Sequence, residues 1–176
     1  MTAEVRIRRC GPEDAPVLLG LIRELAAYER LEQDVVGTAE MLALHLAGDP
    51  PLIEALLAED GGGRSLGFTL VYTTFSTFLA RPGLHIEDLY VVPTARGAGV
   101  GGALLAAVAA MAAERGAGRV EWDVLDWNEP AIGFYRRLGA APVDGWTRYR
   151  LTAGAIARVA GAGPETRGQV AAEPLS

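Results

Sequence analysis

Seven residues from Arg96 to Gly102, which read Arg-Gly-Ala-Gly-Val-Gly-Gly, could bind an anion. They lie between an apolar, strand-like run at 84–92 and an alanine- and leucine-rich run at 103–115 that we predict to be a helix. Glycines let consecutive backbone N–H groups turn toward one point, and the helix adds N–H groups without intrahelical partners and its positive dipole end. Arg96 adds a fixed charge suited to a phosphate oxygen. The pattern predicts a site for a phosphate-bearing ligand.

The same glycines could instead form a flexible turn or a dinucleotide-binding loop. A strand that stops at Pro93 and a helix that follows are the setting that phosphate loops require, which counts against a mere turn. Gly97, Gly99 and Gly102 also fit the dinucleotide spacing G-x-G-x-x-G. However, residues 93–96 separate strand from glycines, and too little chain follows to build the sheet that this class needs. Gly-Lys-Ser/Thr is missing, so a P-loop nucleotide hydrolase is excluded.

The elements that would position this loop alternate between strands and helices. Alternating or continuous apolar runs predict strands at 4–9, 52–59, 65–78, 84–92, 120–125 and 146–151. Helical periodicity and capping residues predict helices at 11–28, 38–47, 103–115, 128–138 and 152–160. Thr38 and Asn128 are the expected N-caps.

The composition suits one domain with a core of its own. The chain has 176 residues, half of them hydrophobic, and a domain of this size buries roughly 70% of its unfolded surface. We predict a single domain at 1–160. The tail at 161–176 lacks aromatic residues and is rich in small and polar ones, which is typical of flexible segments.

Charge and cysteine usage limit the partners. A formal net charge of −6 gives no general electrostatic case for nucleic acid or an anionic membrane, and it favours cationic small molecules. Cys10 is the only cysteine, and the first residues lack the apolar core of a signal peptide, so we expect a cytoplasmic protein. The apolar run at 103–113 is too short to span a bilayer. His45 and His85 are single and unclustered, so no metal site is expected.

The loop resembles the acetyl-CoA loop of the GNAT acetyltransferases, in which Arg/Gln-x-x-Gly-x-Gly/Ala follows a strand and opens a helix. Arg96, Gly99 and Gly101 meet this spacing. Residues 126–140 resemble the closing N-x-x-A-x-x-F-Y-x-x-x-G-F motif of the superfamily, and Trp-Asn-Glu-Pro at 127–130 is similar to the diamine (spermidine/spermine) and thialysine acetyltransferase branch. The resemblance implies an α/β fold with a mixed central sheet of about seven strands flanked by about four helices.

The same resemblance implies which residues bind acetyl-CoA, the expected co-substrate. The pantetheine would pair with the strand at 84–92 as an added strand, and the pyrophosphate would lie on the loop. The implied coenzyme-binding residues are Leu89, Tyr90, Val91, Arg96, Gly97, Ala98, Gly99, Val100, Gly101, Gly102, Asn128, Pro130, Ala131 and Tyr135.

Acyl transfer to an amine needs a base, because a primary ammonium is almost fully protonated at pH 7. The resemblance assigns this role to Glu87, acting through a water, and the role of acid toward the departing thiolate to Tyr135. From the residues alone, Glu87 could be a surface carboxylate and Tyr135 a core aromatic. Glu87 and its neighbour Asp88 point to opposite faces of a strand, so only one lines the site. We expect this strand to be central, where a buried Glu87 would be costly and would therefore suggest function.

Acids and aromatic rings form the expected acceptor site, which suits a diamine, a polyamine or thialysine. Its residues are Tyr28, Glu29, Glu87, Asp88, Asp144 and Trp146. Asp144 stands where the resembled branch has a glutamate. An aminoglycoside or a peptide lysine remains open as the acceptor, and so does a non-catalytic acyl-CoA sensor. The resemblance implies a homodimer.

Overall fold

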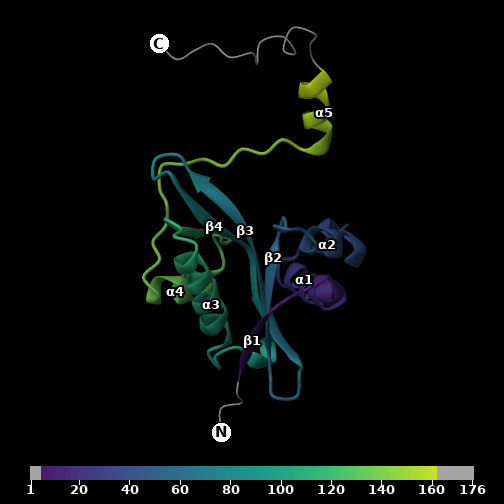
Figure 1. Cartoon of the computed structure of the whole chain (residues 1–176), viewed down its shortest axis with the longest axis vertical. Coiled ribbons are helices and arrows are strands. Elements are labelled where there is room, and N and C mark those ends of the chain that lie inside the picture. Colours follow the sequence, from purple (N-terminus) through teal and green to yellow (C-terminus); the bar gives the residue numbers. More distant parts are fainter. Residues whose placement is uncertain (1–4, 162–176) are drawn as a thin grey trace. The chain divides into compact units, whose positions relative to one another are not determined.

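A mixed β-sheet positions the candidate site (Figure 1). The structure is a computed structural model that describes residues 5–161, and the chain divides after Asp126 into two compact units. In the first unit five strands lie in chain order, and neighbours are antiparallel except for the parallel last pair. These strands are β1 (Arg6–Arg9), β2 (Glu54–Glu59), β3 (Ser65–Ser76), β4 (Arg81–Val91) and β5 (Val120–Trp122).

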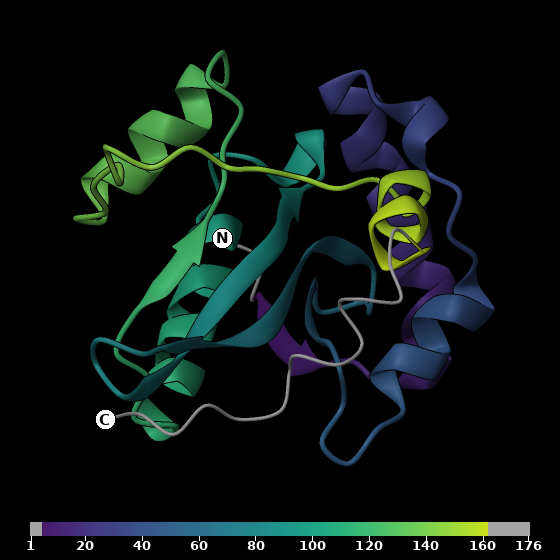
Figure 2. The ribbon, with the colours of Figure 1, turned by 90° about the horizontal axis from the view of Figure 1, so that it is seen from above.

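Helices cover both faces of this sheet (Figure 2). α1 (Ala15–Glu29) and α2 (Ala39–Leu46) pack on one face, and α3 (Val100–Glu114) packs on the other. The Thr38 hydroxyl accepts a hydrogen bond from the Met41 amide at 3.3 Å, which confirms the predicted cap of α2. Because both faces are covered, the inner strands are apolar on both sides, as the buried run in β2 shows.

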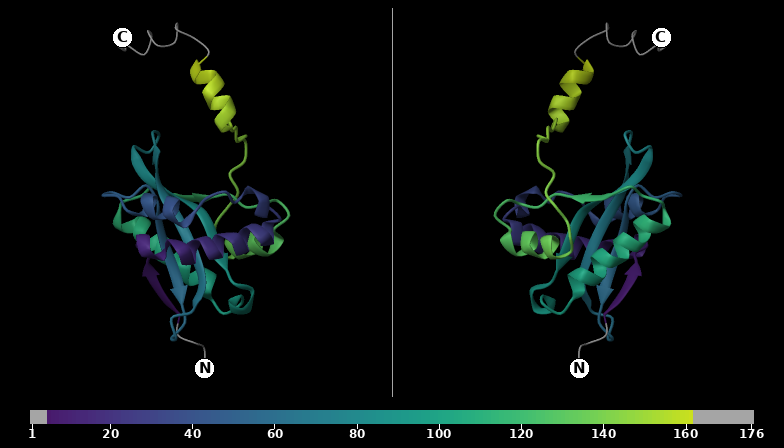
Figure 3. Two further views of the ribbon diagram at one scale, coloured as in Figure 1. Left: turned by 90° about the vertical axis from the view of Figure 1, so that its right-hand side faces the viewer. Right: turned by 90° about the vertical axis from the view of Figure 1, so that its left-hand side faces the viewer.

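Two clusters of buried side chains form the core, one on each face. Val71, Leu84 and Ile86 of the sheet pack with Leu104 and Val108 of α3. The other cluster is formed by α1, α2 and the strands, and its members include Leu18, Leu21, Leu57, Phe68, Leu70 and Tyr90. The hairpin of β3 and β4, the two longest strands, extends past the ends of β1 and β2 (Figure 3).

The second unit contains α4 (Glu129–Arg137) and α5 (Ala153–Gly161), both predicted from the sequence. The strand predicted at 146–151 is wrong, because these residues form neither helix nor strand. Trp146 and Tyr149 are 81% and 91% exposed, so no buried face favours an extended strand there, whatever the intrinsic preference of the residues. The resemblance implied about seven strands and about four helices, whereas residues 5–161 form a sheet of five strands and five α-helices.

The predicted tail at 162–176 lies outside the described residues, and the single-domain assignment of 1–160 stays a prediction. Within the part of the chain that the structure describes, no helix combines the length and apolar character needed to cross a membrane.

Candidate active site

The glycine-rich loop has the backbone geometry that an anion site requires. After β4 the chain forms a short 3-10 turn, Pro93–Ala95, and Gly97 and Gly99 then adopt positive φ angles of 76° and 85°. Gly99 is the N-cap of α3, so the helix begins at Val100, three residues earlier than predicted. Added Cβ atoms at Gly97 and Gly99 would meet nothing within 4 Å, so backbone conformation and not crowding demands glycine. The first amides of α3 thus remain available to a ligand.

Beside this loop, β4 offers a strand edge. β5 pairs with β4 only from Leu84 to Ile86, whereas β4 continues to Val91. The Val92 amide donates to the Leu66 carbonyl of β3, at 3.0 Å. Backbone groups alternate along a strand, so those of Leu89 and Val91 point away from β3, toward the side where β5 has ended. This edge fits the predicted pairing with pantetheine through Leu89 and Val91, while the backbone of Tyr90 faces β3.

A bulge in β4 decides which carboxylate is buried. Leu70 pairs with Asp88 and Val71 with Ile86, which leaves Glu87 as an extra residue. Glu87 is exposed, so the expectation of a buried Glu87 is wrong, although β4 is central. The physical reason is that the bulge interrupts the alternation of faces on which that expectation depended. Asp88 takes the half-buried position, on the face covered by α1 and α2.

Three carboxylates interact at this end of the first unit. Burial raises the pKa of Asp88 to about 6, and the negative charges of Glu87 and Glu29 contribute to this rise. Burial also raises the pKa of Glu29, the last residue of α1. The helix ends there because Arg30 adopts a left-handed conformation with φ 62°. The structure therefore brings together three of the predicted acceptor-binding acids.

The side chain of Arg96 lies against two aromatic rings. Its guanidinium carbon Cζ is 4.7 Å from the ring centre of Tyr28 and 5.7 Å from that of Tyr90. Its Nε donates a hydrogen bond to the Val91 carbonyl at 3.0 Å. The Tyr90 hydroxyl donates to Glu24 Oε2 at 3.2 Å. Sequence reasoning missed Glu24, although its spacing of four residues from Tyr28 on a helix would have placed both on one face.

Sequence reasoning also missed that His85 lies near an acid. Its Nε2 lies 3.8 Å from Oδ2 of Asp123, and its ring stacks on Tyr72 with centroids 5.0 Å apart. Among residues 5–161 there is no group of three or more His, Cys, Asp or Glu side chains arranged to hold a metal ion.

The remaining candidates belong to the second unit. The Asn128 side chain accepts a hydrogen bond from the Ala131 amide at 3.4 Å and caps α4, with Pro130 in its first turn, as predicted. Tyr135 is half-buried, and its ring centre lies 5.2 Å from that of Phe134. Asp144 and Trp146 are both exposed. The catalytic and binding roles of these residues stay predictions.

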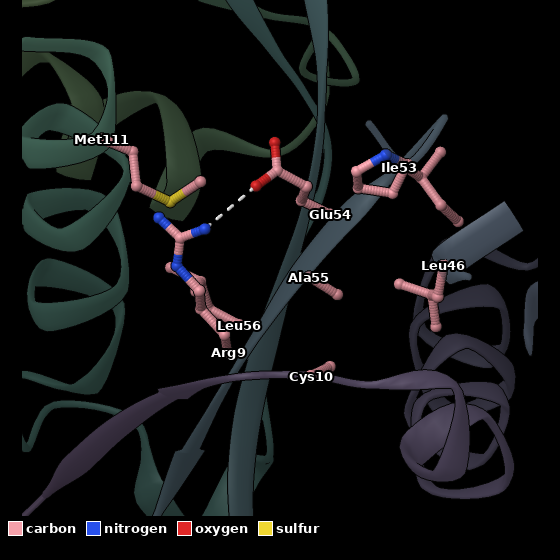
Figure 4. A pocket seen from close by; sticks show the side chains of 9 residues that line it. Arg9, Cys10, Leu46, Ile53, Glu54, Ala55, Leu56 and Met111 are labelled. Carbon is pink, nitrogen blue, oxygen red and sulfur yellow. Dashed lines mark hydrogen bonds and ion pairs between the residues drawn. The ribbon is translucent and has the colours of Figure 1, made fainter. Parts of the chain in front are cut away.

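A small cavity of about 120 Å³ lies elsewhere in the first unit, near the start of β2 (Figure 4). Its lining includes Cys10, Ile53, Glu54 and Met111. Burial and the charge of Asp14 raise the pKa of the Cys10 thiol to about 12, so this thiol is not nucleophilic at neutral pH. The predicted site residues do not line this cavity.

Comparisons with known proteins agree with the geometry. The acetyltransferase (GNAT) family model matches residues 21–140. The chain is 34% identical to thialysine N-epsilon-acetyltransferase of Sus scrofa, across 90% of this chain and 99% of that protein. It is 33% identical to L-ornithine N5-acetyltransferase of Arabidopsis thaliana, across 86% of each. Among solved structures, an integron cassette protein of V. cholerae superposes with a TM-score of 0.73 at 24% identity, covering 91% of this chain and 98% of that one.

The match over most of the chain, the α/β fold and the glycine loop before α3 lead to one conclusion. The chain belongs to the acetyltransferase (GNAT) family and is an acetyl-CoA-dependent N-acetyltransferase.

Proposed function

We propose that this enzyme transfers the acetyl group of acetyl-CoA to a terminal primary amine of a small cationic acceptor, namely a diamine, a polyamine or a thialysine-like amino acid. The observation that carries this proposal is the interacting group of Glu29, Glu87 and Asp88 beside the β4 edge. Such a group favours an ammonium over a neutral ligand. The named substrates of the two relatives, thialysine and ornithine, each have a terminal primary amine.

On the coenzyme side, the amides that follow Gly97 and Gly99 would bind the pyrophosphate, with the dipole of α3 behind them. The backbone of Leu89 and Val91 would pair with the pantetheine amides, because their polar groups point to the side where β5 has ended. This pairing would direct the thioester along β4. One of these strand N–H groups would donate to the carbonyl oxygen as negative charge develops on it.

The reaction is direct attack in a ternary complex. The acceptor ammonium first gives a proton to Glu87 through a water, which leaves a neutral amine nucleophile. A nitrogen–carbon bond forms at the acetyl carbonyl, and the carbon–sulfur bond then breaks. Tyr135 protonates the departing thiolate, and the second proton of the amine nitrogen passes through solvent to reprotonate Tyr135. The proton taken up by Glu87 is the one released per turnover. Asp88 and Glu29 would hold the acceptor by charge.

An acetyl-CoA consumption assay across a panel of acceptors tests the proposal. We expect higher kcat/KM for putrescine, spermidine, thialysine and ornithine than for a neutral amine of equal length. Equal values for charged and neutral acceptors would remove the cationic-acceptor assignment. A preference for an aminoglycoside or a peptide lysine would replace the proposed acceptor class with that one. Tight acetyl-CoA binding in calorimetry without turnover of any amine would favour a sensor.

We also propose a cytoplasmic homodimer, built from one acetyltransferase domain per chain at 1–160. Its support is the family resemblance together with exposed apolar side chains such as Trp146 and Tyr149. Light scattering coupled to size-exclusion chromatography should give twice the chain mass, and a monomer mass at micromolar concentration would overturn the dimer.

A further inference from the structure

One arginine, Arg96, contacts two groups that the two substrates of the proposed reaction would use. The Arg96 guanidinium lies against the Tyr28 ring, while its Nε donates to the Val91 carbonyl. Under the proposed function, Val91 pairs with pantetheine, Tyr28 offers its ring face to the acceptor ammonium, and Arg96 neutralises a coenzyme phosphate. The structure therefore links a coenzyme residue to an acceptor residue through a direct contact.

The two tyrosine rings that contact Arg96, those of Tyr28 and Tyr90, are themselves held in place. Tyr90 forms its second wall at 5.7 Å. The Tyr90 hydroxyl donates to Glu24, and burial together with the charge of Glu24 raises the pKa of Tyr90, so the hydroxyl remains a donor at neutral pH. Tyr28 stands one turn after Glu24 on α1. The two rings thus come from α1 and β4, two elements that pack in the same core cluster.

One face of a ring holds one cation within about 6 Å, so an acceptor ammonium on the face of Tyr28 that the Arg96 guanidinium covers would compete with that guanidinium. Coenzyme phosphates offer Arg96 a stronger, charge-assisted interaction than an aromatic ring does. The next residue, Gly97, has a positive φ, and a Cβ added there would meet nothing within 4 Å.

We propose that Arg96 is a positioning residue that couples acceptor binding to coenzyme binding. Without coenzyme, its guanidinium covers the ring of Tyr28. When the coenzyme phosphates bind the guanidinium, the ring becomes free for the acceptor ammonium and the Val91 carbonyl becomes free for pantetheine. The inference rests on the proposed function, because it needs a cationic acceptor beside Tyr28.

Coupling of this kind is reciprocal: each ligand raises the affinity for the other by the same factor. The value of one cation–π contact at a partly exposed site corresponds to about a two- to fivefold change in affinity. The structure thus predicts cooperativity that depends on a single side chain. Removing that side chain should tighten acceptor binding to the coenzyme-free enzyme, an effect that a purely structural role would not produce.

Calorimetry on the full chain tests this, with putrescine and thialysine as probes and CoA as the unreactive coenzyme. In the wild type, saturating CoA should tighten binding of the probe about two- to fivefold. Arg96→Gln should bind the probe without CoA as tightly as the wild type does with CoA, and CoA should add nothing. The KM for acetyl-CoA should rise in this variant, while kcat changes little.

Three further variants define the contact. Arg81→Gln removes one positive charge at the start of β4, the opposite end of the strand from Val91, and should keep the coupling. Tyr28→Phe keeps the ring and should also keep the coupling, whereas Tyr28→Leu removes the ring and should abolish the coupling. Probe affinity that CoA does not change in the wild type, or coupling that survives in Arg96→Gln, overturns the inference but leaves the proposed function intact. Failure of both probes to bind in every arm rejects the acceptor class and the coupling together.

Discussion

Two groups of carboxylates in the first unit have opposite electrostatics. Where β1 meets α1, Asp14 accepts hydrogen bonds from Arg8 at 2.7 and 2.8 Å and from the Gly11 amide at 2.9 Å. These bonds lower its pKa, although the side chain is only 10% exposed. Where α1 ends against β4, burial raises the pKa of both Glu29 and Asp88. The pKa of a poorly exposed carboxylate is therefore lowered where an arginine bonds to it and raised where burial is the main influence.

The two groups differ in whether an arginine is paired with each acid. Glu54 is paired bidentately with Arg115 at 2.6 and 2.7 Å, and Glu59 accepts from Arg8 at 2.9 Å. Within residues 5–161, no ion pair joins an arginine to Asp88. A buried carboxylate without a cation is unfavourable in the free enzyme, and a bound ammonium relieves that cost. The acids that are paired with arginines stabilise the structure, and the acids without an arginine partner are the ones that we propose bind the acceptor.

The largest expected effect concerns Tyr135, which tests whether acid–base chemistry needs a group beyond the carboxylates. Tyr135→Phe removes only the hydroxyl, so kcat should fall by roughly 10² to 10⁴ while acetyl-CoA affinity and Tm stay near wild type. Steady-state kinetics beside a thermal melt provide the measurement. A stable variant with near-normal kcat would mean that the thiolate is protonated elsewhere or leaves unaided.

Glu87→Gln tests the proposed base, which the bulge leaves exposed. The amide cannot accept the ammonium proton, so kcat should fall by roughly 10² or more, with little change in Tm because Glu87 is exposed. Glu32→Gln, at another exposed acid, is the matched control and should behave as wild type. If kcat survives in Glu87→Gln but collapses in Asp88→Asn, the base is Asp88.

Asp88→Asn should separate binding from stability. We expect kcat/KM for putrescine to fall about 10- to 100-fold, because one charge-assisted contact to the ammonium is lost. The folded pKa of Asp88, about 6, exceeds the unfolded value of about 3.9, so the stabilising contribution of this group is complete below pH 4 and disappears as the pH rises through 6.

The free energy of unfolding of the asparagine variant should therefore exceed that of the wild type at pH 7 to 8 by on the order of 1–2 kcal/mol after allowance for solvent screening, with a smaller difference near pH 4. Its melting temperature should be higher accordingly. Thermal melts of both proteins across pH provide the test. A variant that is less stable at pH 8 would show that Asp88 has a favourable partner in the fold.

Asp14→Asn should lower stability at neutral pH, in contrast to Asp88→Asn, and should have the smallest effect on kcat. Loss of the charged bonds to Arg8 should lower the free energy of unfolding by about 2 kcal/mol at pH 7. The folded pKa of Asp14 is lowered, so its stabilisation is complete above about pH 4 and is lost as the pH falls below that value. Denaturant unfolding at pH 7 and pH 3 measures this, and kcat of the folded variant should remain near wild type. A large loss of kcat at full stability would break the division between the two groups.

The sequence by itself determined the fold class, the places of the five helices within residues 5–161, and the place of the glycine-rich loop. These features depend on local patterns: glycines with positive φ before Val100, a hydroxyl cap at Thr38, and apolar runs in β2 to β4. Family resemblance added the coenzyme and the amine because it compares those same local stretches.

Only the tertiary structure decided where the site's charges lie. The bulge that turns Glu87 outward arises from the pairing of β4 with β3, and the contact of Arg96 with Tyr28 joins residues 68 positions apart. The absence of a strand at 146–151 likewise reflects the lack of a buried face there, which strand preference does not reveal. Backbone geometry over a few residues is encoded locally, whereas register, burial and side-chain partners depend on long-range packing.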